Sequence, residues 1–88
     1  MFVVINPYTV VNIDVSQKIK ITQDLTVNAY CIELCTLSGE LLGCTLGEYD
    51  TEKEAKCALE CLLTAMSRGD RLHRMLDREN AHNIALEV

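Results

Sequence analysis

The spacing of apolar residues changes near Asp50, and this change limits the fold classes open to the chain. Before Asp50, Ile19 and Ile21 alternate with polar neighbours, which is the two-residue period of a half-buried strand. After it, apolar residues recur at helical spacing until Gly69. The sequence therefore predicts an α+β fold: a four- to five-stranded antiparallel sheet (meander), followed by one main amphipathic helix and a short C-terminal helix.

Turn-forming residues divide the N-terminal half into extended segments. Asn6-Pro7 ends the first apolar run, Gln23-Asp24 supplies a second turn, and Ser38-Gly39 closes a hairpin. Extended segments are expected at residues 2–5, 8–14, 18–22, 25–36 and 40–49.

The hairpin register follows from its turn. If Ser38 and Gly39 are the central turn residues, Cys35 pairs with Leu42, Glu33 with Cys44 and Cys31 with Leu46. The cysteines then share one face, either as small core residues or as a possible second metal-binding group. The other face is also apolar, so the N-terminal strands, the C-terminal tail or a second subunit in a twofold dimer must cover it. Its residues are Tyr30, Ile32, Leu34 and Leu41.

The main helix is expected to begin after an N-cap at Asp50 or Thr51 and to end at Arg68. A second short helix is expected at Arg71–Glu79, with Asp70 as its cap. Steps of about 100° per residue place one apolar stripe on the main helix. Its members are Ala55, Leu59, Leu62, Leu63 and Met66.

Size and charge exclude several functions. With 88 residues the chain is expected to form a single domain, residues 1–88, around one small core. The 13 acidic residues outnumber the 8 basic ones, and the net charge of −5 argues against direct nucleic-acid binding. No apolar run approaches the roughly 18 residues of a membrane helix, and no basic leader precedes the first strand. No nucleophile motif or glycine-rich phosphate loop is present, so we expect no enzyme and no catalytic residues.

One junction is distinctive. The segment 46–55 reads Leu-Gly-Glu-Tyr-Asp-Thr-Glu-Lys-Glu-Ala, and a Ser38-Gly39 hairpin precedes it. Over residues 1–66 the chain resembles small proteins of phages and mobile elements of Gram-positive bacteria that carry an LGxYxTxxxA strand-to-helix junction. The resemblance implies an antiparallel meander closed by a helix and a bacterial cytoplasmic location. It points to host-takeover or anti-defence factors, including type II anti-CRISPR proteins, and it transfers no catalytic residue.

The same junction also has a structural interpretation. Leu46 is expected to be buried against the helix, Gly47 to let the chain pass close to it, and Tyr49 to cover the start of the helix. Ala55 would permit close approach of helix and sheet.

Cysteine and histidine spacing suggests a metal site. Cys57 and Cys61 are four residues apart and project from the same side of the helix, opposite its apolar stripe. With His73 and His82 they could bind zinc, and Asp77 could serve as a ligand or support one. Alternatively, the two thiols line a contact between subunits or lie under the C-terminal tail.

Acidic residues gather at the same junction. Glu48, Asp50, Glu52 and Glu54 could imitate a phosphate backbone and bind a basic groove on a partner protein. They could equally be present only because carboxylates favour a helix start. A stripe of arginines downstream indicates a solvated or partner-binding face.

These observations favour a phage-type inhibitor that acts by binding, with a host CRISPR effector nuclease as its partner and zinc as a possible stabilising ion. The alternative is a small dimeric regulatory or structural module that sequesters a small signalling ligand. A thiol redox sensor is a third hypothesis, and it requires a cysteine of low pKa.

Overall fold

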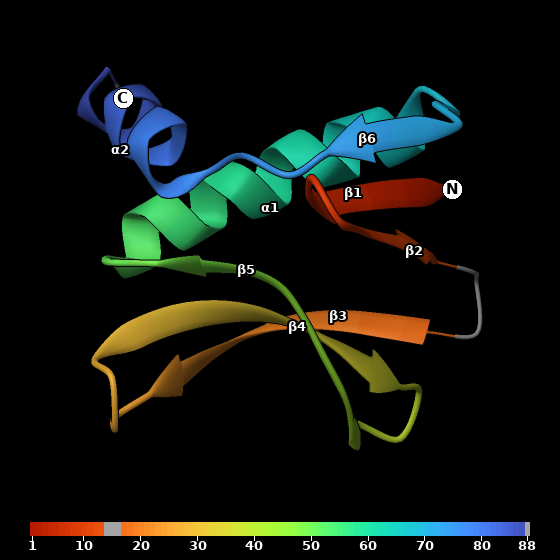
Figure 1. Cartoon of the computed structure of the whole chain (residues 1–88), viewed down its shortest axis with the longest axis horizontal. Helices are drawn as coiled ribbons and strands as arrows, with labels where there is room; N and C mark the ends of the chain where they lie inside the picture. Colours follow the sequence, from red (N-terminus) through yellow and green to blue (C-terminus); the bar gives the residue numbers. More distant parts are fainter. Residues whose placement is uncertain (14–16, 88) are drawn as a thin grey trace.

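The computed structural model of the chain describes residues 1–13 and 17–87. Within them the predicted α+β class is confirmed, with strands leading into one main helix and a short C-terminal helix (Figure 1). The strands are β1 (Phe2–Asn6), β2 (Thr9–Asn12), β3 (Gln17–Asp24), β4 (Ala29–Thr36), β5 (Leu41–Tyr49) and β6 (Leu72–Arg74). The helices are α1 (Glu52–Ser67) and α2 (Arg78–Leu86).

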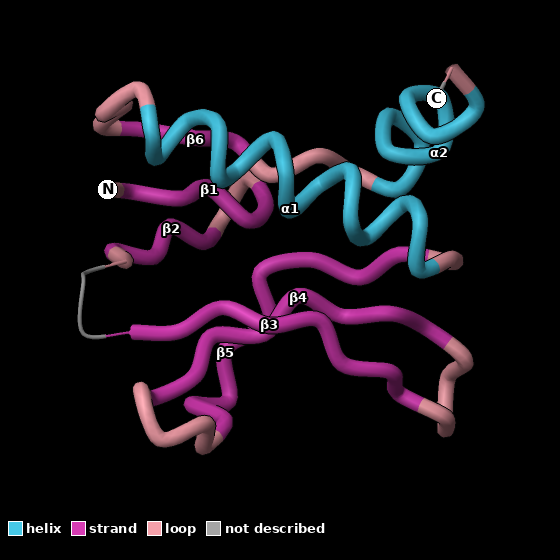
Figure 2. The backbone as a smooth tube through the Cα atoms, turned by 180° about the vertical axis from the view of Figure 1, so that it is seen from behind, coloured by secondary structure: helices cyan, strands magenta, loops and turns pink. Residues whose placement is uncertain are grey.

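The strands form two three-stranded sheets rather than the one sheet of four or five strands that the sequence predicts. The first has the order β2-β1-β6 and the second the order β3-β4-β5. Most neighbouring strands are antiparallel, but β6 runs parallel to β1. The chain therefore returns to its own first strand after passing through α1 (Figure 2).

The predicted helix at 71–79 is wrong, because the start of this segment completes the first sheet. Phe2 N donates to the Arg71 carbonyl at 2.8 Å, and Met75 N donates to the Val4 carbonyl at 3.0 Å. These bonds satisfy the free edge of β1, which local helical spacing could not reveal. The short helix instead begins after Asp77, whose side chain accepts a hydrogen bond from Asn80 N.

The β4–β5 hairpin is displaced from its predicted register. Gly39 N donates to the Thr36 carbonyl at 2.9 Å, so the central turn residues are Leu37 and Ser38. Gly39 follows with a φ of 96°, a left-handed conformation that favours glycine. Farther along, bulges shift the pairing again at Gly43, whose φ is 69°, and at Leu46. The observed pairs include Cys35 with Leu41, Leu34 with Cys44, Glu33 with Thr45 and Cys31 with Glu48.

The first turn of the second sheet is also displaced. Gln23 and Asp24 still belong to β3, and the turn lies at residues 25–28. Asp24 accepts a hydrogen bond from Thr26 N, and Asn28 has a φ of 52°, a conformation that asparagine tolerates. Strand β4 accordingly begins at Ala29 rather than at the predicted residue 25.

Helix α1 has the predicted limits but a different buried stripe. Thr51 is the N-cap and accepts a hydrogen bond from Glu54 N, while Gly69 ends the helix with a φ of 75°. Leu63 and Met66 are 48% and 41% exposed, contrary to the predicted stripe. Small side chains take most of the buried positions, which lets the helix approach the strands closely. The buried apolar residues of α1 are Ala55, Ala58, Leu62 and Ala65.

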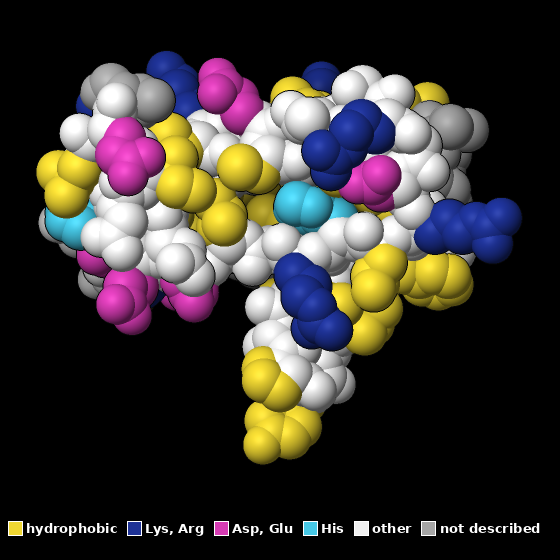
Figure 3. All heavy atoms as spheres, turned by 90° about the horizontal axis from the view of Figure 1, so that it is seen from above, with side chains coloured by type: hydrophobic (Ala, Val, Ile, Leu, Met, Phe, Trp, Pro, Cys, Tyr) yellow, Lys and Arg dark blue, Asp and Glu magenta, His cyan; other side chains and the backbone are white. Residues whose placement is uncertain are grey.

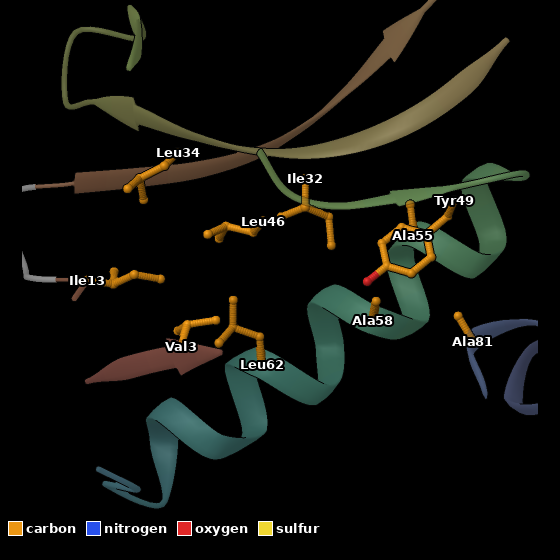
Figure 4. Packing of buried hydrophobic residues seen from close by; sticks show 10 residues of the cluster. All are labelled: Val3, Ile13, Ile32, Leu34, Leu46, Tyr49, Ala55, Ala58, Leu62 and Ala81. Atoms are coloured by element: carbon orange, nitrogen blue, oxygen red, sulfur yellow. The ribbon is translucent and has the colours of Figure 1, made fainter. Parts of the chain in front are cut away.

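The core lies between α1 and the two sheets (Figure 4). Val3 from the first sheet points toward Leu62 of α1, and Ile32, Leu34 and Leu46 point inward from the second. Ile32 and Leu34 of the second apolar hairpin face are thus buried within this chain, whereas Leu41 of that predicted face is 56% exposed.

Tyr49 explains the glycine of the distinctive junction. Its side chain is fully buried, and its hydroxyl donates to the Leu76 carbonyl at 2.7 Å. A Cβ on Gly47 would lie 2.6 Å from this hydroxyl oxygen and 2.9 Å from the ring. Gly47 therefore makes room for the tyrosine ring, not for the helix as the sequence analysis expected. The predicted burial of Leu46 and Ala55 is confirmed.

Candidate functional site

A groove lies on the side of α1 that faces away from the core. Its volume is about 730 Å³, within the range of small-ligand sites. Figure 3 looks onto this part of the surface, where a histidine and several hydrophobic side chains lie between the α2 end and the β6 end. The lining residues are Lys53, Lys56, Cys57, Glu60, Cys61, Thr64 and Arg68 of α1, His73 of β6, Leu76, and Ile84 of α2.

The parallel pairing of β6 brings the imidazole into the groove. His73 pairs with Val3 of β1, and the histidine lines the groove together with Cys57 and Cys61 of α1. The His73 Nε2 atom is buried and has no hydrogen-bond partner among the described residues. Burial lowers the pKa of His73, with Asp70 opposing the shift and Arg68 adding to it, so the ring is neutral at pH 7.

The groove thiols are free and half-buried. Burial raises the pKa of Cys61, and the neighbouring Cys57 and Glu60 raise it further. Burial likewise raises the pKa of Cys31 and Cys44 in the second sheet. For Cys31, Cys44 and Cys61 these shifts oppose the redox-sensor hypothesis, because a reactive sensor thiol needs a lowered pKa.

The structure brings three of the four predicted zinc ligands into one groove. Cys57, Cys61 and His73 line it together, although β6 was not predicted. His82 lies apart, with its Nδ1 atom 2.9 Å from Glu54 Oε1. Asp77, the suggested auxiliary ligand, caps α2 instead. Across residues 1–13 and 17–87, no three His, Cys, Asp or Glu side chains are already arranged as a metal-binding group.

The three hairpin cysteines do not all share one face. Cys44 pairs with Leu34 and packs against the core, whereas Cys31 and Cys35 alternate with the core-facing residues of β4. The bulge at Gly43 turns Cys44 to the core side. Glu33, the charged residue between these cysteines on β4, accepts a hydrogen bond from Thr45 Oγ1 at 2.8 Å.

The four predicted partner-binding carboxylates have two different environments. Glu48, Asp50 and Glu52 have at least half of their side chains exposed, but Glu54 is buried and faces His82. Arg78 lies 3.3 Å from Glu48 and 3.7 Å from Asp50. Glu54 therefore does not belong to the exposed acidic surface. Arg78 of α2 adds a cation to that surface, which the sequence pattern did not predict.

Two contacts of this region were not anticipated. The Tyr49–Leu76 hydrogen bond holds one wall of the groove, and the Glu54–His82 pair joins the first turn of α1 to α2. The groove residues Leu76 and Ile84 were missed because the position of α2 was wrong. The tendency of a buried tyrosine hydroxyl to find a hydrogen-bond partner was the available signal for the first contact.

Comparison of the chain with protein-family models, with curated proteins and with solved structures finds no match in any of the three. Neither α1 nor α2, the helices of the described part of the chain, is long and apolar enough to cross a membrane.

Proposed function

We propose that this protein inhibits a larger enzyme by binding to it, and that the enzyme is a host defence nuclease, specifically a CRISPR effector. One observation carries the proposal. The exposed carboxylates of Glu48, Asp50 and Glu52 lie close together in the chain, at the strand-to-helix junction that resembles the phage proteins. Nucleic-acid channels of such nucleases are basic, so a clustered anionic surface on an inhibitor would complement them.

The ion pairs within the junction do not oppose this role. Arg78 and Lys56 contact the three carboxylates, but all of these side chains are half-exposed or more. Exposed ion pairs contribute at most about 1 kcal/mol, so arginines of a partner can replace the internal cations. The net charge of −5 would also attract the chain to a basic partner over longer distances.

A cleavage assay tests the proposal. The protein is added in molar excess to a purified, guide-loaded type II CRISPR effector, and DNA cleavage and co-purification are measured. We expect cleavage to fall and a stable complex to form, with weaker binding at higher salt. Full cleavage at molar excess, without a complex, would contradict the proposed partner.

Matched variants test the surface. The triple variant Glu48→Gln, Asp50→Asn, Glu52→Gln changes the net charge from −5 to −2. The control Glu40→Gln, Glu79→Gln, Glu87→Gln makes the same change elsewhere. The junction variant should inhibit about tenfold less well or worse, and the control should stay within about twofold of the unchanged protein. Equal losses would indicate net charge rather than this surface.

A further inference from the structure

Two thiols and one imidazole line the same groove although they come from separate elements. Cys57 and Cys61 stand one helical turn apart on α1, and His73 comes from β6. The pairing of β6 with β1 places the histidine in the lining of the same groove as these thiols. Sulfur and imidazole nitrogen are the ligand atoms that zinc prefers in proteins.

The buried nitrogen of His73 is the second, independent observation. His73 Nε2 is shielded from solvent and has no hydrogen-bond partner in the described part of the chain. Native proteins rarely leave a buried polar side-chain atom unpaired, and a bound ion is one of the explanations. Imidazole nitrogen is a common metal ligand.

We propose that Cys57, Cys61 and His73 bind one zinc ion in this groove, with a water molecule as the fourth ligand. Each thiol releases its proton to solvent, so two thiolates balance the charge of Zn²⁺. Two cysteines, one histidine and water form a recognised zinc coordination set. This proposal does not depend on the proposed inhibitor function.

The ligands must turn inward to close around the ion, because the described side chains do not form a ready cluster. The groove leaves space for such rotation, and its volume of about 730 Å³ far exceeds that of one ion and its water. Thiol side chains move between staggered rotamers without a change in the backbone. His82 takes no part, since it contacts Glu54.

Cobalt and zinc titrations of the full, reduced chain test the site. Co²⁺ should give thiolate-to-cobalt charge-transfer absorption that saturates at one ion per chain, and Zn²⁺ should remove it. Native mass spectrometry should show the mass of a single zinc ion. Absence of both signals would overturn the proposal.

Variants assign the ligands. Cys57→Ser with Cys61→Ser should abolish the cobalt signal, and His73→Gln should weaken metal binding by about tenfold or more. The control pairs Cys44→Ser with His82→Gln, which removes the same residue types outside the groove and should leave binding unchanged. A signal that survives in the first variant, or is lost equally in the control, would refute the assignment.

Alkylation of the unchanged chain avoids any variant that fails to fold. Bound zinc should slow iodoacetamide labelling of Cys57 and Cys61, as measured by peptide mass spectrometry. Labelling of Cys44, which lies in the second sheet, should not change. Equal labelling rates with and without zinc at the two groove thiols would overturn the site.

Discussion

The two long faces of α1 differ sharply although they belong to one helix. On the core face Ala55, Ala58 and Leu62 are completely buried against the sheets. On the opposite face Cys57 and Cys61 are only half-buried and open into the groove. The sheets cover the first face, whereas β6 and α2 only flank the second. A helix face that carries small residues is therefore buried or partly exposed according to which elements pack against it.

A hydrogen bond connects the core to the groove. Tyr49 is buried in the core beside α1, and its hydroxyl donates to the carbonyl of Leu76, which lines the groove. The segment between β6 and α2 is thus held by a core residue. Substitutions at Tyr49 should mainly lower the stability of the core and, to a smaller extent, change the position of the segment that lines the groove.

The largest expected effect is a difference in the free energy of unfolding between variants of two neighbouring leucines of α1, the buried Leu62 and the half-exposed Leu63. Leu62→Ala removes a completely buried side chain and should lower the free energy of unfolding by about 2–5 kcal/mol. Leu63→Ala changes a side chain that is half-exposed and should cost well under half of that. Urea denaturation of both variants measures the difference. Similar losses would mean that the core does not lie on the Leu62 side.

Alkaline pH should weaken the core through Tyr49. Burial, with Asp77 and Cys61 adding to it, raises the pKa of Tyr49 to about 12, against an ordinary value of about 10. Below pH 10 the phenol is protonated in both states, and its contribution to stability is complete. Between about pH 10 and 12 the unfolded state ionises first, so up to about 2.7 kcal/mol of stability is lost.

Denaturation across this pH range, compared between the unchanged protein and Tyr49→Phe, isolates that contribution. The variant should start from a lower stability at neutral pH, because the Leu76 carbonyl loses its donor. Its stability should then fall less steeply above pH 10. Parallel curves for the two proteins would contradict the burial of the phenol.

The smallest effect on stability is expected at Gly47, which lies against the Tyr49 ring. Gly47→Ala places a Cβ 2.6 Å from the Tyr49 hydroxyl oxygen, and the resulting shift should cost about 1–3 kcal/mol. Combining it with Tyr49→Phe removes the closest contact but leaves the ring at 2.9 Å. The double variant should therefore lose less than the sum of the single losses, as measured by thermal or urea unfolding. Strict additivity would show that the two residues do not interact.

Local signals in the sequence predicted α1 well and the hairpins less well. Thr51 and Gly69 set the ends of α1 through capping and a left-handed backbone, which depend on neighbouring residues only. The hairpin turn lies one residue earlier than predicted. Its central residues are Leu37 and Ser38, not Ser38 and Gly39. A shift of one residue changes which cysteine faces which partner.

The candidate site was predicted in part. The spacing of Cys57 and Cys61 on one helix side followed from helical geometry alone, and both lie in the groove. His73 was also among the predicted ligands, but the strand that carries it, β6, could not be derived from local pattern, since residues 71–79 have helical spacing. His82 and its partner Glu54 are 28 residues apart, so local pattern did not predict their contact either.

Taken alone, the sequence determined the α+β class, the limits of α1 and the side of that helix on which the thiols lie, because these depend on periodicity and caps within a few residues. Only the tertiary structure decided that the strands divide into two sheets and that β6 pairs with β1. It also placed His73, rather than His82, in the groove that the thiols line. Pairing between distant strands depends on which backbone edge remains unsatisfied after the rest of the chain has folded, and no local window contains that information.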